Sequence, residues 1–419
     1  MIFRTQKFTK QLKRIAILVV SLSVIFVVFR KHLIYKPYRY YRSTLALTGR
    51  VEISLPAKDF NYLDSLRLAV LKTEKVTPLH RIYVKGEILY NNEISKIKIR
   101  LKGDQIDHYQ SDPPSYRIKV LDEKTVLGTS KLSIHSFGSR NFLSEWIYHK
   151  MLEQRDVISL NMDVIELNVN NTKSFYTFEE HFTHFLTDRF DRPQGPIICI
   201  DEGLFWSKGA AEQLPSLQNE EKIYYKSPIK KFKYYAELDS NHVKKAKDLL
   251  NRYRNKSLKA SEVFDIKRLA IFFAISDLTN SHHALRWHNN RFYYNPTSDK
   301  LEPIGFDGSS WDPLSVFAYD NEFLKSLRWS ELFSDKNFVQ TYVNELDRIS
   351  NENYLNDFFN QYKNDLYNLA NRIHMRNRFY SKEVFKNDVF FNNNYKVFYA
   401  NAEWIRNNLS EYRNRLLNE

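Results

Sequence analysis

Apolar and polar positions alternate with a period of two in several segments between about residue 50 and residue 180. This alternation is typical of antiparallel strands that bury one face. The turn Asn170-Asn171-Thr172-Lys173 separates the last two segments and favours a hairpin there. The sequence therefore predicts a curled sheet. Its expected strands are residues 81–84, 97–102, 116–120, 162–169 and 174–178.

Helical spacing replaces this alternation elsewhere. The segment 139–154 carries Trp146 and Met151 on one helical stripe, and Ser139 is a plausible cap. Residues 264–278 are too apolar for a surface helix, so we expect that helix to cross the core. We predict an α+β fold with a β-rich N-terminal lobe and a mainly helical C-terminal lobe, and we expect the latter to contain a β-hairpin.

The first 29 residues have the pattern of a membrane anchor. A basic segment without acidic residues precedes an uncharged run over residues 15–29. The run is shorter than the ~20 residues of a typical spanning helix, but no small-residue cleavage site follows it. We therefore expect an uncleaved, single-pass signal anchor in a bacterial membrane, with the globular part outside the cytoplasm, although positive charges on both flanks leave the side open.

These patterns suggest a division of the chain into five parts. The expected parts are a basic N-terminus with the anchor helix (1–32), a juxtamembrane segment (33–49), the β-rich lobe (50–190), a C-terminal lobe with the functional loop and hairpin (191–320), and a helical subdomain (321–419).

The composition is that of a folded, basic protein. Of the 419 residues, 43% are hydrophobic, and the formal net charge is +14. Such a charge attracts polyanions, but no nucleic-acid recognition motif accompanies it, so we expect no nucleic-acid partner. The single cysteine, Cys199, excludes an intramolecular disulfide and a multi-cysteine zinc site, and its apolar neighbours predict a buried thiol.

The segment 275–312 contains the residues best suited to chemistry. Asp277 ends an apolar helix, Asn289 lies in the polar loop that follows, and Asp307 ends the second strand of a hairpin. Phosphoryl transfer needs one carboxylate that orients the attacking hydroxyl, and another that holds magnesium together with an amide oxygen. The alternative is that both aspartates are caps hydrogen-bonded to the backbone.

The order of these three residues, within an Asp-loop-Asn-Tyr-Tyr-hairpin-Phe-Asp frame, resembles the spore coat protein H (CotH) kinase family. Upstream segments resemble that family's motifs in the same order, from about residue 80 to residue 312. These segments are Ile99-Arg100-Leu101-Lys102-Gly103, Ser115-Tyr116-Arg117-Ile118-Lys119, Arg140-Asn141 and Phe175-Tyr176-Thr177-Phe178-Glu179-Glu180.

The resemblance implies an atypical two-lobed protein kinase that uses ATP and Mg²⁺, with Mn²⁺ as a possible substitute, to phosphorylate serine or threonine of an unknown protein substrate. Asp277 would be the catalytic carboxylate, and Asn289 and Asp307 would bind the metal. The cofactor-binding residues would be Lys119 and Arg100 at the phosphates, Glu180 near the adenine, and Glu145 as a partner of Lys119.

Some features depart from that family pattern. No glycine-rich phosphate loop is present, and Gly103 is its nearest substitute. Asn290 could replace Asn289, and the histidines at 282, 283 and 288 leave a metal site open, although they lack the fixed spacing of a zinc motif. A catalytically inactive, kinase-like surface protein that binds a partner or an envelope polymer is therefore the alternative function.

Overall fold

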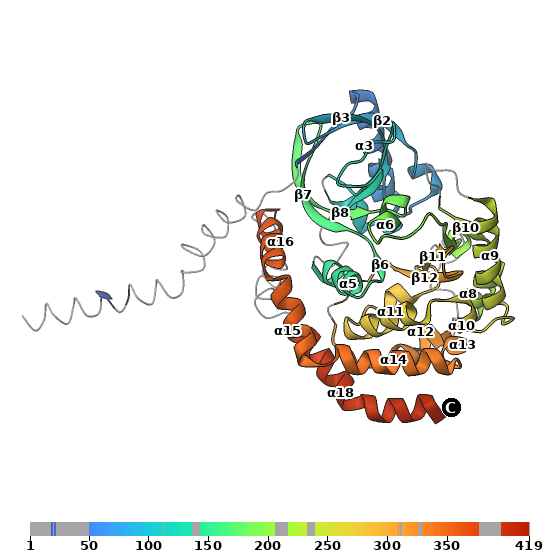
Figure 1. The fold of residues 1–419 in the computed structure, drawn as a ribbon. Helices are drawn as coiled ribbons and strands as arrows, with labels where there is room; N and C mark the ends of the chain where they lie inside the picture. The colour runs from blue at the N-terminus through green and yellow to red at the C-terminus, as the bar shows by residue number, and fades with distance from the viewer. Residues whose placement is uncertain are drawn as a thin grey trace, which may run out of the picture.

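The strands of the N-terminal region close into a barrel (Figure 1). The structure is a computed structural model that describes residues 18, 19, 21, 50–111, 113–135, 143–205, 217–232, 239–308, 310, 312–325, 329–376 and 395–418. The barrel strands are β1 (Arg50–Ser54), β2 (Val84–Tyr90), β3 (Glu93–Leu101), β4 (Tyr116–Val120), β5 (Lys131–His135), β7 (Met162–Val169) and β8 (Thr172–Glu180). Around the barrel they follow the order β1-β2-β3-β4-β5-β8-β7, and a parallel pairing of β1 with β7 closes it.

Most of the predicted strands are confirmed, and the expected curled sheet closes on itself. The strand predicted at residues 81–84 begins only at Val84 and runs on to Tyr90. Alternate residues of the strands point inward, and Val51, Ile99 and Ile118 are completely buried in the barrel core. Closure removes the exposed sheet edges that would otherwise pair with other chains.

A 17-residue helix of this region was not predicted. The helix α3 (Ala57–Thr73) follows β1 and buries little more than Leu63 and Val70, so its apolar stripe is too thin to stand out in the sequence. The helix predicted at 139–154 is observed from Leu143 as α5 (Leu143–Gln154), while residues 136–142 lie outside the described part. The β-rich lobe therefore contains more helix than the sequence predicted. The short helices η2 (Pro78–His80) and α4 (Asp107–Gln110) also belong here.

A second sheet lies beneath the barrel. Its order is β10-β9-β11-β12-β6. The predicted hairpin is confirmed as β11 and β12, whose register pairs Arg291 with Ile304. Cys199 is buried in β9, as predicted. One strand of this sheet comes from the predicted β-rich lobe, because β6 pairs in parallel with β12. The bounds are β6 (Ile158–Ser159), β9 (Ile197–Ile200), β10 (Ile229–Lys231), β11 (Arg291–Asn295) and β12 (Lys300–Gly305).

Helices form most of the C-terminal region. The predicted core helix is α11 (Ile266–Leu278), which is buried from Leu269 to Leu278. It packs on α14 (Lys336–Ile349), and α18 (Tyr395–Asn418) lies against α14 (Figure 1). The other helices are α6 (His184–Asp188), α8 (Leu217–Lys226), α9 (Ser240–Arg254), α10 (Ala260–Val263), η4 (His282–Leu285), η5 (Ala318–Asp320), α12 (Glu322–Lys325), α13 (Trp329–Phe333), α15 (Glu352–Gln361) and α16 (Lys363–Arg376).

The predicted signal anchor falls almost wholly outside the described residues. Of its run over residues 15–29, the structure describes only 18, 19 and 21. A search of the described helices finds none with the length and hydrophobicity needed to cross a bilayer.

Candidate functional site

Asp277 lies in the last turn of α11, and its side chain is completely buried. Its Oδ1 accepts hydrogen bonds from Nε2 of His282 at 2.7 Å and from the backbone N–H of Ala318 at 2.8 Å. The hydroxyl of Tyr342 donates to Oδ2. Burial raises the pKa of Tyr342 well above its usual value, and the neighbouring Asp277 carboxylate adds to this effect. The hydroxyl therefore stays protonated and remains a donor. Both carboxylate oxygens are therefore bonded within the protein, and a catalytic role for Asp277 stays a prediction.

His283 contacts both predicted metal ligands, one through its backbone and the other through its ring. Nδ2 of Asn289 donates to the carbonyl oxygen of His283 at 3.0 Å, and Nε2 of His283 lies 2.9 Å from Oδ2 of Asp307. The side chains of His283 and Asp307 are 49% and 23% exposed, so solvent reaches these two residues, whereas Asn289 and Asp277 are buried. The sequence left His283 open as one of three possible metal-binding histidines, but it did not predict its contact with Asp307.

Asp307 has an unusual backbone conformation at the end of the hairpin. Asp307 follows β12 with a φ of 57°, a left-handed conformation that few non-glycine residues adopt. Gly308 comes next, and a Cβ at that position would lie 2.3 Å from a ring carbon of Tyr148. The chain can therefore pass close to α5 only because residue 308 has no side chain.

The oxygen atoms of Asp307 and Asn289 are suitable ligands for magnesium, which prefers carboxylate and carbonyl oxygens and keeps several water or phosphate ligands. The bond from Asn289 to His283 uses the amide nitrogen, so it leaves the amide oxygen available for a metal. Among the described residues no group of three or more His, Cys, Asp or Glu side chains could hold a metal. A histidine-rich metal site is thus not observed there. Burial lowers the pKa of His288 to about 3, and His288 stacks on Phe205.

The predicted phosphate-binding residues lie side by side on the outer face of the barrel. Lys119 of β4 places its ammonium 4.4 Å from the centre of the Tyr83 ring, and the guanidinium of Arg100 lies 5.4 Å from the same ring. Arg100 is directly opposite Arg117 on the neighbouring strand. The structure therefore brings the two predicted residues together, and it adds Arg117 to them.

Neither predicted glutamate contacts this basic group. Glu145 is completely buried on α5, where Nε2 of His149 lies 3.6 Å from its Oε1, so the predicted pair with Lys119 is not formed. Glu180 ends β8, and its Oε2 accepts hydrogen bonds from the backbone N–H of Asn161 at 3.0 Å and from Arg189 at 2.9 Å. Burial raises the pKa of Glu180, although Arg189 opposes this effect. Contact of Glu180 with an adenine stays a prediction.

Sequence reasoning also missed a buried polar group beside the basic face. Nζ of Lys102 lies 3.3 Å from Nε2 of His135 and 4.0 Å from Oε1 of Glu179. His135 Nε2 lies 3.3 Å from the other oxygen of Glu179. The lysine–glutamate pair of this region is therefore Lys102–Glu179. Lys102 was visible in the Arg-Leu-Lys-Gly segment, but only the barrel register places His135 and Glu179 next to it.

Lys131 of β5 is the most strongly perturbed cation of the basic face. Burial and neighbouring positive charges lower its pKa to about 6. These neighbours are Arg117, Lys119, Arg100 and Lys230. Lys230 belongs to β10 of the second sheet, so the basic face extends to the C-terminal region.

Replacement of this lysine should stabilise the fold. The pKa of Lys131 is lower in the folded protein than in the unfolded chain, where it is about 10.4, so the charged side chain destabilises the fold. This destabilisation is fully present below about pH 6 and disappears above about pH 10.4. We expect Lys131→Met to raise Tm at pH 7 by at least about 2 °C, and by less at pH 9. Thermal unfolding followed by circular dichroism measures this, with the exposed barrel residue Lys173 changed to Met as control. A lower Tm for Lys131→Met would contradict the lowered pKa of Lys131 in the folded protein.

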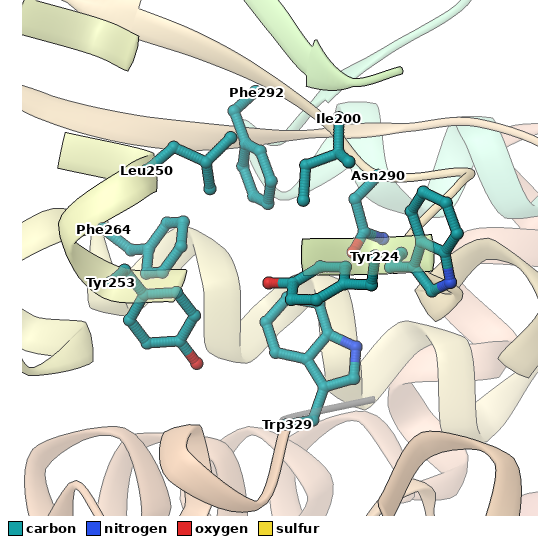
Figure 2. A pocket seen from close by; sticks show the side chains of 9 residues that line it. Ile200, Tyr224, Leu250, Tyr253, Phe264, Asn290, Phe292 and Trp329 are labelled. Carbon is teal, nitrogen blue, oxygen red and sulfur yellow. The ribbon is translucent and has the colours of Figure 1, made fainter. Parts of the chain in front are cut away.

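Two hollows in the C-terminal region are poor candidates for a nucleotide site. An aromatic cavity of about 20 Å³ between α9, β11 and α13 is lined by Tyr224, Tyr253, Phe264 and Trp329 (Figure 2), and it has room for about one water molecule. The alternative ligand Asn290 lines this cavity, and Asp307 is not among its lining residues. An open groove of about 610 Å³ between α10 and the start of α14 contains neither Asp307 nor Lys119.

Comparison with protein-family models finds no match for the chain, and a search of curated proteins likewise finds none.

Proposed function

We propose that the chain is an atypical, two-lobed protein kinase that transfers the terminal phosphate of ATP to serine or threonine of a protein. The observation that carries this proposal is the contact of Asp307 with the loop that holds Asn289, at a partly exposed position after β12. A carboxylate and an amide oxygen at such a position suit magnesium on a phosphate chain. The basic side chains of the barrel face supply the positive charge that such a chain needs.

Each of these residues has a distinct role in the proposed reaction. Asp307 and Asn289 would hold the metal, which supplies charge neutralisation on the phosphates when bound. Lys119 and Arg100 would bind the phosphate oxygens and fix the orientation of the nucleotide. Asp277 would act through its bonds to His282 and to the backbone of residue 318, which position the loop that carries Asn289.

The buried state of Asp277 favours a second function. An acceptor hydroxyl needs a carboxylate within hydrogen-bond reach, whereas both oxygens of Asp277 are bonded inside the protein. A kinase-like protein without catalysis, which binds a partner or an envelope polymer through its basic face, is consistent with this geometry.

The test is transfer of radiolabel from the terminal phosphate of ATP by the full-length protein, to itself and to casein. We expect transfer that requires magnesium and stops on chelation. Absence of both transfer and ATP binding, by protein with a cooperative unfolding transition, would favour the non-catalytic function.

A further inference from the structure

Four lysines lie opposite one another on adjacent barrel strands. The strand register pairs Lys85 of β2 with Lys98 of β3, Lys98 with Lys119 of β4, and Lys119 with Lys131 of β5. Neighbouring strands are about 4.8 Å apart, so the four backbone positions span about 14 Å. We call these four residues the lysine ladder.

The lysine ladder lies on the outer face of the barrel. Its members alternate along their strands with buried residues such as Val84, Ile97 and Ile118, which point into the core. Lys85 and Lys98 are exposed, whereas Lys119 and Lys131 are partly buried. The ladder therefore runs from open solvent on β2 toward the second sheet, where Lys230 adds positive charge next to Lys131.

Such an arrangement is costly without a ligand. Like charges directly opposite each other on neighbouring strands destabilise a sheet. Among the described residues no carboxylate forms an ion pair with a ladder lysine, and Glu87 of β2 lies opposite Lys96 instead. The second row of this face adds the opposed pair Arg100 and Arg117. A solvated charged face would interleave both signs, whereas this one carries six basic residues in two adjacent rows, the four ladder lysines together with Arg100 and Arg117.

We propose that the lysine ladder binds a linear phosphate polymer of the inorganic polyphosphate type, laid across strands β2 to β5. Lysine ammonium groups are point charges that bind phosphate without demanding a fixed geometry. A triphosphate is shorter than the ladder and would occupy only part of it. A repeating chain can contact all four lysines at once. The proposal goes beyond the proposed kinase function and does not require phosphoryl transfer.

The neighbourhood of the ladder fits phosphate better than a single-stranded nucleic acid. Sequence-independent binding of single strands relies on exposed aromatic rings that stack on bases. The aromatic ring beside the ladder, Tyr83, has the charged groups of Lys119 and Arg100 over it. At the inner end, a bound phosphate would oppose the burial and the neighbouring positive charges that lower the pKa of Lys131, and would therefore favour its protonated form.

The test is binding of fluorescently labelled long-chain polyphosphate to the full-length protein, without nucleotide or magnesium, with unlabelled tripolyphosphate as competitor. We expect the long chain to bind more tightly, and both to weaken with salt. Lys131→Met should weaken both ligands about fivefold, whereas Lys85→Met should weaken only the long chain by about that factor. Lys173→Met, on the far end of β8, should change neither.

Three results would overturn the proposal. They are equal losses for Lys85→Met and Lys173→Met, the same affinity for both chain lengths, and equal binding of a single-stranded oligonucleotide of matched charge. Because Lys131→Met is expected to stabilise the fold, its weaker binding would not reflect unfolding. Chain-length-dependent binding without any phosphate transfer would contradict the proposed kinase function and support polyphosphate binding by the lysine ladder. Phosphate transfer without polyphosphate binding would support the kinase function and contradict binding by the ladder.

Discussion

Asp277→Ala is expected to lower the free energy of unfolding by about 3–5 kcal/mol. Three donors converge on this fully buried carboxylate: the His282 ring, the backbone N–H of Ala318 and the hydroxyl of Tyr342. Alanine leaves the His282 ring and the backbone N–H of Ala318 without this acceptor, and the Tyr342 hydroxyl keeps only its long contact with the hydroxyl of Tyr412 at 3.4 Å. It also opens a cavity at the end of α11. Since typical domains are stable by only 5–15 kcal/mol, a large part of the stability would be lost.

Urea unfolding followed by circular dichroism measures this change. The matched control is Asp248→Ala on α9, where the carboxylate is 58% exposed and lies 3.8 Å from Arg252. We expect that exposed pair to contribute less than about 1 kcal/mol. An Asp277→Ala protein as stable as the wild type, but inactive in transfer, would instead indicate that Asp277 acts directly on the acceptor hydroxyl.

The outcome for Asp277 illustrates a limit of sequence reasoning. A carboxylate at a helix end before a polar loop fits both a catalytic residue and a hydrogen-bonded cap. The structure supplies the bond to the backbone of residue 318 that the cap alternative requires. It also supplies Tyr342 from α14, which lies far along the chain and could not be paired with Asp277 by spacing.

Local periodicity predicted the elements that form from neighbouring residues. The strands around Ile99, Ile118 and Leu167 alternate regularly, so their existence could be read from the sequence. The hairpin does not alternate, but its turn at Asn295 and Pro296 was visible. The apolar helix before Asp277 was equally visible.

Pairings between distant segments could not be predicted in this way. Barrel closure depends on β1 meeting β7, which pairs Arg50 with Glu166. The lysine ladder likewise depends on a register that no local pattern specifies, since a shift of one residue would move Lys119 to the inner face. The basic charge was visible in the composition, but its arrangement in rows was not.

Asp307→Asn is expected to reduce magnesium-dependent phosphate transfer by at least about 100-fold, if the chain is the proposed kinase. The substitution removes the negative charge that would hold the metal, while asparagine tolerates the left-handed backbone at this position, with its φ of 57°. The loss should therefore appear in transfer and in metal affinity, and Tm should change little. Radiolabel transfer at several magnesium concentrations measures it.

Asp299→Asn is the matched control, because Asp299 lies in the turn of the same hairpin and has a φ of 58°. Its carboxylate bonds to the hydroxyl of Tyr294 at 2.7 Å and to Lys245 at 2.5 Å, away from His283. We expect transfer by this variant to stay within about twofold of the wild type, since exposed pairs contribute little. Equal losses in both variants would indicate a general effect of hairpin charge, and unchanged transfer in Asp307→Asn would remove Asp307 from the metal site.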